Sequence, residues 1–577
     1  ITGIDIIEGE FNIWLPVTEI SGKGTEFFYP TLNTTLTIPS TANKVISVGG
    51  YDSQNGNFSE FSGRGFTRTG GIKPDLVAPA EFIISTAPGS GYGSFTGTSF
   101  AAPHVTGACC LMMQWGIIQN NDPYLYGQRL KAFLRAGATR SQNIIYPNSN
   151  WGFGTLCIEK SLDLISYYNY DRPISYPSTS YFDIQNSESG PDSENRISEA
   201  TNIPEEQING NTQIMGPIPE SQSISPLEQR LRNAPPVPKN VNPALDELYA
   251  DSIAIYDSRT KDLLKKFPGI QVSLVLQGGY AIVHVPRDNI NEYRDVLENR
   301  VVAEVPVICG LLEDPQALID SGITAVKNQP YLDLKGNGVI IGVIDTGIDY
   351  TLPSFKYENG KSKILYLWDQ SIQDGPPQGF MYGTEYTNEQ INAANQSDNP
   401  YSIVPSRDEV GHGTFLSALM AARTNGNSTY SGAAPDADII AVKLKPAKIT
   451  SRRDESIYND EVPAYSSINI MSGIEYLFRK SVSLGKPLVI SIGLGSNNGA
   501  HDGLSFFERY ISGLALTNGI GIICAVGNEG NMSHHFYTDL SSSNSAQIEF
   551  NVSANNPGFM MNIWAFAPDR ISISLTT

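Results

Sequence analysis

The chain has 577 residues, 40% of them hydrophobic, and its 59 acidic side chains outnumber its 39 lysines and arginines, which gives a formal net charge of -20. This length exceeds what a single hydrophobic core usually serves, so we expect two or more domains. The acidic balance argues against a nucleic-acid partner and against docking on anionic membranes. No apolar run approaches the roughly 20 residues that a membrane-spanning helix needs.

Neither the cysteines nor the histidines indicate a metal centre or a disulfide framework. The five cysteines are Cys109, Cys110, Cys157, Cys309 and Cys524, and no two of them are spaced as C-x-x-C. The six histidines show no metal-ligand spacing either. We therefore expect no metal ion and no cofactor.

Both ends of the chain have the pattern of β-strands. Residues 1–40 start without a methionine and alternate apolar with polar side chains, and a similar alternation appears in residues 541–577. We interpret the first stretch as the end of an inserted β-rich module and the last as the start of one. The chain is accordingly expected to be a fragment cut inside two β-rich regions.

The most informative stretch of residues 41–180 is G-T-S-F-A-A-P-H-V-T-G at 97–107, where a loop is predicted to turn into a helix. Gly97 allows an unusual backbone conformation, and a proline in a first helical turn costs no hydrogen bond. Ser99 would then lie at the positive end of the helix dipole, which favours negative charge developing beside it. A serine alone is a poor nucleophile, so this hypothesis requires a histidine base and a carboxylate. The alternative is a Gly/Ser-rich turn that only caps a helix.

The middle of the chain changes character twice. Residues 181–242 are dominated by Ser, Asn, Glu and Pro without hydrophobic periodicity, which predicts a disordered linker. Residues 243–312 recover a compact pattern that predicts a small α+β domain. The expected elements are a helix over 243–249, strands over 271–276 and 280–285, a helix over 290–298 and a strand near 301–308.

Residues 313–540 have the alternation of strands and helices that is typical of a doubly wound sheet. The run G-V-I-I-G-V-I-D at 338–345 reads as a parallel strand buried on both faces. Its last residue, Asp345, lies where catalytic groups collect, beyond the carboxyl end of a strand. The alternative for a single aspartate at this place is a simple turn residue.

Two further residues of this region are candidates for chemistry. His412 lies in G-H-G-T at the predicted start of a helix, where the glycines leave the imidazole unobstructed, and an imidazole has the pKa range of a general base. Asn528 follows an apolar strand in G-N-E-G. Taken alone, a histidine is usually structural and an asparagine before such a turn is usually a turn former.

Together these stretches resemble the sequence motifs of the subtilases, the subtilisin-like serine proteases, as do K-P-D-L-V-A-P at 73–79 and D-T-G-I-D at 345–349. The resemblance implies an α/β fold with a doubly wound, mostly parallel sheet, helices on both faces, and hydrolysis of protein or peptide substrates. It also implies a role for each matching residue. Ser99 would be the nucleophile, His412 the general base, Asp345 the carboxylate that orients it, Asn528 the oxyanion donor, and Ser491, Ile492 and Gly493 the strand that pairs with the substrate.

The position of residues 243–312, immediately before the first core strand, resembles that of the subtilase propeptide. Such a domain would be a partner of the chain's own catalytic domain, and its tail near 305–312 would lie across the cleft beside His412. The alternative is an ordinary accessory domain.

The layout as a whole resembles the clostridial Csp germination proteases, which process a cortex-degrading hydrolase when spores germinate. This resemblance implies a spore-associated or secreted protein. Subtilases run in the order Asp, His, Asn, Ser, whereas this chain begins with the serine motif. It is therefore either a fragment of two tandem copies or a circular permutation, and its motifs either meet in one composite core or belong to separate sites. A catalytically inactive pseudoprotease that only binds remains the alternative function.

Overall fold

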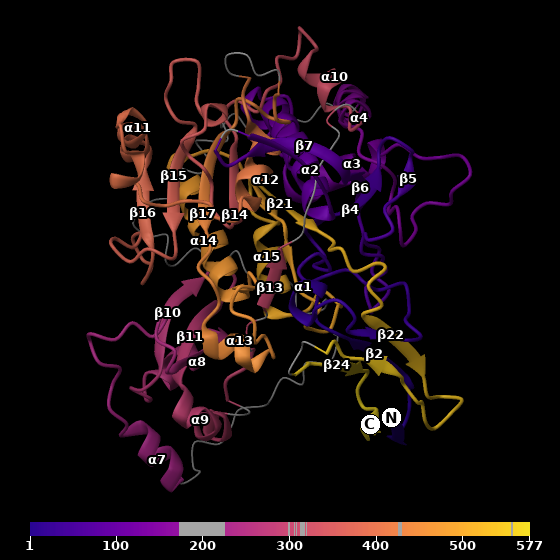
Figure 1. Ribbon diagram of the computed structural model, residues 1–577, viewed down its shortest axis with the longest axis vertical. Coiled ribbons are helices and arrows are strands. Elements are labelled where there is room, and N and C mark those ends of the chain that lie inside the picture. The colour runs from indigo at the N-terminus through magenta and orange to yellow at the C-terminus, as the bar shows by residue number, and fades with distance from the viewer. Residues whose placement is uncertain are drawn as a thin grey trace.

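The structure is a computed structural model, which describes residues 1–89, 91–171, 225–297, 300–304, 306, 308–311, 318, 320–424, 430–554 and 558–576. A nine-stranded sheet lies at its centre (Figure 1). In order across the sheet the strands are β16 (Thr384–Thr387), β15 (Ile364–Asp369), β17 (Asp438–Lys443), β14 (Ile340–Asp345), β19 (Leu488–Ile492), β21 (Ile520–Ala525), β4 (Ile46–Asp52) and β5 (Asn57–Phe58), with β6 (Leu76–Pro79) also paired to β4.

Both predicted parts of the catalytic domain contribute to this sheet. The strands from β15 to β4 and β6 are parallel to their neighbours, and β16 and β5 are antiparallel. The two parts join where β21 pairs with β4, with Ile523 opposite Ile46. The predicted doubly wound, mostly parallel α/β fold is thus confirmed.

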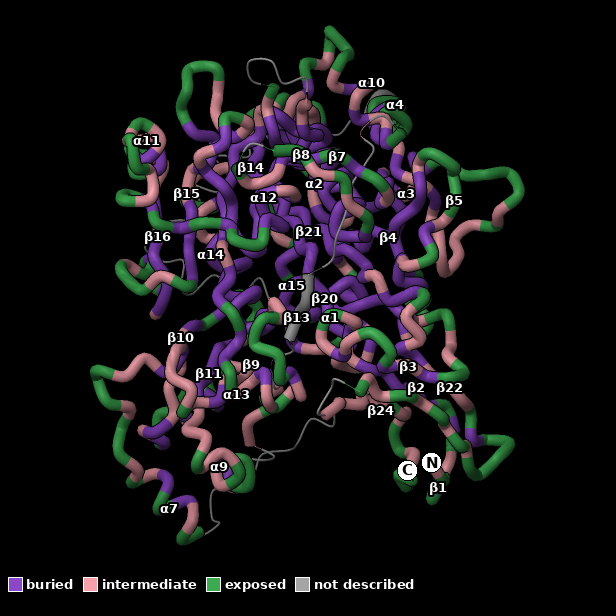
Figure 2. Tube along the Cα trace, in the orientation of Figure 1, coloured by how far each residue is buried: buried purple, intermediate pink, exposed green. Residues whose placement is uncertain are grey.

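Helices cover both faces of the sheet because its inner strands are apolar on both sides. In β14, Ile341 and Val343 face one hydrophobic cluster while Ile340 and Ile344 face another, as the alternation of a strand dictates. The first cluster contains residues of α2 (Thr98–Met113), α3 (Gly127–Gly137), α4 (Ile158–Asp171) and α12 (His412–Ala421), and the second contains residues of α14 (Ser467–Leu484) and α15 (Phe506–Leu514). Figure 2 shows buried residues concentrated in this central layer.

Smaller elements surround the core. They include the hairpin of β7 (Glu81–Ala87) and β8 (Gly91–Thr96), the π-helical turn η1 (Gln114–Ile118), and the helices α10 (Ile323–Lys327), α11 (Asn388–Gln396) and α13 (Ile449–Asp454). Among the described residues, no helix has the length and apolar character needed to cross a membrane.

The two predicted β-rich stretches meet in one unit, which we call the β-unit, and both termini lie there side by side (Figure 1). Its pairs are β1 (Thr2–Asp5) with β25 (Arg570–Ser572), β2 (Glu10–Trp14) between β22 (His535–Asp539) and β24 (Asn562–Ala565), and β3 (Glu26–Phe27) with β23 (Phe550–Asn551), with α1 (Thr18–Ser21) alongside. Because β22 pairs with β2, the second stretch starts at His535 and not at 541 as predicted.

Residues 225–297 and 300–304 form a small α+β unit, which we call the module. Its antiparallel sheet has the order β10 (Gln271–Leu276), β11 (Tyr280–Pro286), β9 (Tyr249–Ile255) and β12 (Ala303–Glu304), and its helices are α7 (Pro226–Arg232), α8 (Ser258–Leu264) and α9 (Ile290–Leu297). The two predicted strands and the helix over 290–298 lie close to their predicted bounds. The helix expected over 243–249 is wrong, because that segment forms turns before β9.

The end of the predicted linker also needs correction. Residues 172–224 lie outside the described residues, but α7 belongs to the module, because Leu231 is buried against Phe267 and Tyr293. Glu228 of the same helix forms an ion pair with Arg300. The stretch 225–242 is therefore not a disordered linker.

The strand expected near 301–308 is divided into two. After β12, the chain leaves the module and forms β13 (Ile308–Leu311), which lies between β18 (Tyr465–Ser466) and β20 (Leu494–Gly495) of the core. It is antiparallel to both, with Cys309 opposite Tyr465 and Gly310 opposite Gly495.

Candidate active site

Ser99 lies in the first turn of α2 and is fully buried. The surrounding residues are small where space is needed. A Cβ added at Gly493 would lie 3.2 Å from the Ser99 Cβ and 3.4 Å from the Cε1 of His412. A glycine at 493 therefore lets the serine and the histidine approach each other.

His412, the first residue of α12, links the serine to a carboxylate. Its Nδ1 lies 2.8 Å from the Oδ1 of Asp345, and its Nε2 lies 3.4 Å from the Oγ of Ser99. Because an ionised carboxylate can only accept, Nδ1 carries the ring hydrogen and the lone pair of Nε2 faces the serine hydroxyl. Asp345 is 1% exposed at the carboxyl end of β14, so its charge acts on the imidazole with little screening by water.

Two buried carboxylates, those of Asp345 and Asp408, make the electrostatic field at this chain of three residues negative. Burial and then the same two charges raise the pKa of the Tyr465 hydroxyl in β18. A negative field of this kind stabilises a positive charge on His412.

Asn528 follows β21 and faces the start of α2. Its Oδ1 accepts hydrogen bonds from the backbone N–H of Thr98 (2.9 Å) and from the Thr98 hydroxyl (3.2 Å). The same hydroxyl accepts a bond from the N–H of Gly527 (3.0 Å). With its oxygen held in this way, the amide has its Nδ2 hydrogens left to donate. Sequence reasoning missed this role of Thr98, although the residue precedes Ser99 in the recognised motif.

The predicted substrate-pairing strand is displaced along the chain. Ser491 and Ile492 belong to β19 in the interior of the sheet, where Ser491 is paired with Val343 on one side and Ile523 on the other. Backbone groups occupied in this way cannot pair with a substrate. The edge that accepts another strand is β20, Leu494–Gly495, and β13 occupies it. Of the three predicted residues, Gly493 lies close to the side chains of Ser99 and His412.

The site is assembled from distant parts of the chain. Ser99 and His412 are separated by 313 positions, yet the sheet and the packing of α2 against α12 bring them together. Of the two outcomes that the order of the motifs left open, separate sites or one composite core, the structure has the composite core. Metal-binding groups of three or more acidic, His or Cys side chains are absent from the described ranges.

The buried Asp–His–Ser chain lies where a parallel strand ends and two helices begin. An arrangement of this kind defines a serine-hydrolase type of site. The comparison with protein families gives the class a narrower name. Residues 25–154 and 336–563, more than half of the chain, match the subtilase family of S8 peptidases. The chain belongs to the subtilase family.

Individual relatives match over shorter stretches. The intracellular serine protease of Paenibacillus polymyxa is 40% identical over 106 residues, which cover 18% of this chain and 30% of that protein. The major intracellular serine protease of Bacillus subtilis (strain 168) is 45% identical over 80 residues, 14% of this chain and 23% of that protein. Among solved structures, the Clostridium perfringens CspB protease is 35% identical over 36% of this chain and 40% of that chain, with a TM-score of 0.31. The chain thus spans less than a third of the two curated relatives' length.

Proposed function

We propose that the chain is a serine endopeptidase that cleaves peptide bonds through an acyl-enzyme. The Oγ of Ser99 attacks the scissile carbonyl carbon while His412 Nε2 takes its proton, and Asp345 stabilises the imidazolium that forms. The Nδ2 of Asn528 and the backbone N–H of Ser99 donate to the oxyanion. His412 then gives its proton to the leaving amine, and water, activated by the same histidine, hydrolyses the ester.

One observation carries this proposal: Asp345, His412 and Ser99 lie in a line of contacts at 2.8 Å and 3.4 Å in a buried site. The longer of the two distances suits a resting enzyme, because catalytic hydrogen bonds often shorten only when substrate is bound. Membership of the subtilase family supports the same chemistry.

The substrate is proposed to be a protein segment in extended conformation. The edges of β18 and β20 accept a strand between them, since β13 pairs with both of them. Pairing along the backbone gives affinity that depends little on side chains. Because β13 follows the module directly, we propose that the module acts as a propeptide that presents this strand to the cleft.

The biological substrate is proposed from the resemblance to the Csp germination proteases. We propose a spore-associated or secreted enzyme that processes a cortex-degrading hydrolase. Incubating the chain with the precursor of such a hydrolase and sequencing the new N-terminus tests this directly, and an intact precursor beside a cleaved general peptide would contradict it.

A fluorophosphonate probe tests the chemistry itself. We expect the wild-type chain to be labelled and Ser99→Ala to be unlabelled with its circular dichroism unchanged, since only an activated hydroxyl reacts. The matched control is Ser94→Ala, which removes an exposed serine of β8 and should leave labelling intact. Equal labelling of Ser99→Ala would refute the assignment of the nucleophile. No labelling of any variant would instead favour a pseudoprotease that binds without catalysis.

A further inference from the structure

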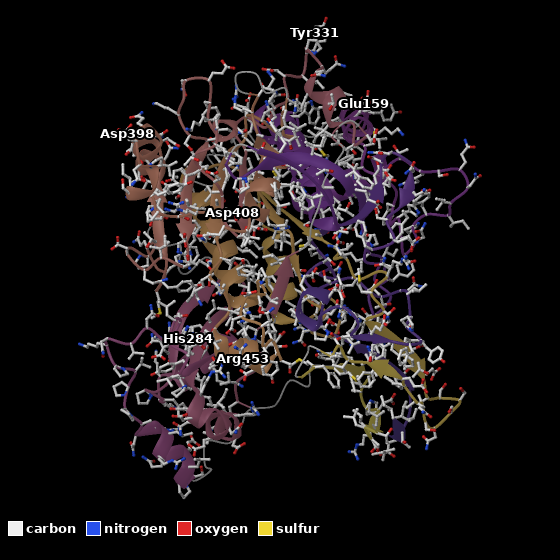
Figure 3. The ribbon with its side chains drawn as sticks, viewed as in Figure 1. Glu159, His284, Tyr331, Asp398, Asp408 and Arg453 are labelled. Atoms are coloured by element: carbon white, nitrogen blue, oxygen red, sulfur yellow. The ribbon has the colours of Figure 1, made fainter. Side chains whose placement is uncertain are left out.

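The carboxylate of Asp408 lies between the two loops that carry Asp345 and His412, although the mechanism above gives it no role. In Figure 3 it lies among the elements of the core, well away from His284 of the module. The side chain is buried, with 7% exposure. A buried carboxylate is unfavourable unless its charge is compensated, so its partners indicate what it does.

Four donors surround this carboxylate, and they come from both loops. Its Oδ1 accepts from the hydroxyl of Thr346 (2.7 Å) and the N–H of Gly411 (2.8 Å). Its Oδ2 accepts from the N–H (2.8 Å) and the hydroxyl (2.7 Å) of Thr414. Thr346 directly follows Asp345, while Gly411 and Thr414 flank His412.

These bonds hold the start of α12, on which His412 is the first residue. The first N–H groups of a helix have no partner inside the helix, and a glycine at the cap, Gly411, has no side chain to bind them. Asp408 fills that role from three positions earlier. Its negative charge at the helix start is also favoured by the helix dipole.

A second layer of bonds ties the same loops together. The hydroxyl of Thr346 accepts from the N–H of Gly413 (3.0 Å), and that of Thr414 accepts from the N–H of Asp349 (2.9 Å). Lys443, the lysine beside this loop, pairs with Glu409 at 2.5 Å, so Asp408 is held by neutral donors. The loops leave little room to adjust, because a Cβ added at Gly347 would lie 3.2 Å from the Asp408 Cα.

We propose that Asp408 is a positioning residue of the catalytic site, an inference that rests on the proposed peptidase function. By binding Thr346 beside Asp345 and the backbone on both sides of His412, it sets the approach of the imidazole Nδ1 to the Asp345 carboxylate. It touches no reacting atom. Its effect therefore falls on the chemical step and not on substrate pairing at β20.

The first test is Asp408→Asn in the full chain. An amide offers one acceptor atom in place of two, and its NH₂ group faces donors, so the loops must separate. We expect kcat on a fluorogenic peptide to fall about 100-fold, since a small misplacement of catalytic groups has effects of that order. KM should change less than about threefold, because β18 and β20 are untouched. The control is Asp398→Asn, an exposed aspartate at the edge of the molecule.

A spectroscopic readout separates positioning from activity. The Nδ1 proton of His412, held by Asp345, should give a far-downfield NMR resonance in the chain labelled with ¹⁵N-histidine, which the conformational change in Asp408→Asn should shift or broaden. An unchanged resonance together with kcat within threefold of wild type would overturn the proposal. If the wild type proves unreactive toward the peptide and the fluorophosphonate, the peptidase function fails, and the resonance alone decides the role of Asp408.

If Asp408→Asn does not fold, variants of Thr414 decide the matter. Thr414→Val removes the hydroxyl bond to Asp408 and the one from the N–H of Asp349, and it should lower kcat about tenfold, equivalent to about 1.4 kcal/mol, and shift the His412 resonance. Thr414→Ser keeps the hydroxyl and should restore both readouts. Equal values for Val and Ser would refute the inference.

Discussion

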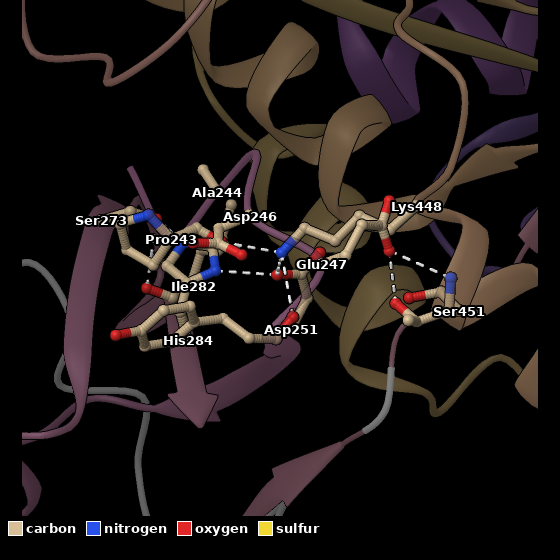
Figure 4. Close-up of polar contacts among 12 residues, drawn as sticks. Pro243, Ala244, Asp246, Glu247, Asp251, Ser273, Ile282, His284, Lys448 and Ser451 are labelled. Atoms are coloured by element: carbon tan, nitrogen blue, oxygen red, sulfur yellow. Dashed lines mark hydrogen bonds and ion pairs between the residues drawn. The ribbon is translucent and has the colours of Figure 1, made fainter. Parts of the chain in front are cut away.

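The two halves of the catalytic core are joined to each other in one way, and the module is joined to the core in another. The halves meet along the β21–β4 pair and through α2, all of whose residues are buried, and Gly107 of α2 packs directly on Ala433. The module also buries apolar residues against α14, but its contact contains charged groups. Lys448 of the core lies 2.8 Å from Asp251 and 2.7 Å from the carbonyl of Pro243 (Figure 4).

Further polar contacts extend along the surface between module and core. Glu247 of the module accepts from the N–H groups of Ile449 (2.9 Å) and Thr450 (3.0 Å) at the start of α13, and Glu304 accepts from the N–H of Phe506 (2.6 Å) at the start of α15. Water can replace such bonds when the surfaces part, whereas it cannot replace apolar packing. The two parts of the core are thus joined along an apolar seam, whereas the module is attached through apolar contacts mixed with buried ion pairs and hydrogen bonds.

The largest effect is expected from breaking the seam. A Cβ at Gly107 would lie 2.1 Å from the Ala433 Cβ and 3.3 Å from its Cα, so Gly107→Val forces the halves apart. We expect the free energy of unfolding to fall by about 3 kcal/mol or more, measured by urea denaturation. The control is Gly513→Ala in α15, where an added Cβ meets nothing within 4 Å. A loss below about 0.5 kcal/mol would show that the seam tolerates repacking.

A smaller effect is expected at the module. Burial alone raises the pKa of Asp251, but hydrogen bonds and charges from His284 and Lys448 hold it below its usual range. Asp251→Asn leaves Lys448 without its counter-charge. We expect the module to open more easily by about 2 kcal/mol, seen as faster amide exchange in β9 and β11 with the core sheet unchanged.

The control for this change is another Asp→Asn substitution in the module. Asp262 pairs with Lys265 at 3.0 Å, but both side chains are mostly exposed. Asp262→Asn should therefore leave exchange in β9 and β11 as it is. If both variants opened the module equally, the buried pair would have no special part in docking.

The smallest effect is expected at the β-unit, as a dependence of the unfolding free energy on pH. It arises at the contact between His534 and Glu529. Burial lowers the pKa of His534, but the charge and the hydrogen bond of Glu529, together with the hydrogen bond to the Thr25 carbonyl, outweigh it and raise the pKa above the ordinary value of 6.5. This stabilisation is complete below the unfolded pKa and is lost as the pH rises through the folded one. The unfolding free energy of the wild type should thus fall between pH 6.5 and pH 9 more than that of His534→Gln.

His104 supplies the matched control, because burial lowers its pKa to about 4. The stability that a neutral His104 provides is lost only as the pH falls below the ordinary histidine range. His104→Gln should therefore keep the wild-type dependence of the unfolding free energy on pH above pH 7. A flat wild-type profile there would contradict the assignment to His534.

The sequence predicted what depends on local pattern. The strand that ends in Asp345 was recognised because a parallel strand buried on both faces is a continuous apolar run. The strands β10 and β11 and the helix α9 were placed for similar reasons. Strand β9 was missed, because Asp251 interrupts its pattern and is compensated by Lys448, 197 positions away.

The errors have identifiable physical causes. The helix expected at 243–249 does not form because the Asn242 and Asp246 side chains accept from the N–H groups of Ala244 (3.2 Å) and Leu248 (2.9 Å), which stabilises turns. The pairing edge was placed at Ser491 because nothing in the local sequence shows that β19 lies in the sheet interior. The role of Asp408 depends on two loops meeting, which no local pattern could reveal.

If peptides pair with β18 and β20 as proposed, the position of β13 makes this pairing a competition within one molecule. A peptide that pairs with β18 and β20 must displace a strand tethered to the same chain, whose effective concentration is in the millimolar range for a short connection. Free peptide at micromolar concentration is then outcompeted even if its intrinsic affinity is equal. Cutting the chain once between β13 and the core would leave the strand joined to the core only through the module and the long segment 172–224, which lowers its effective concentration without altering any contact in the site.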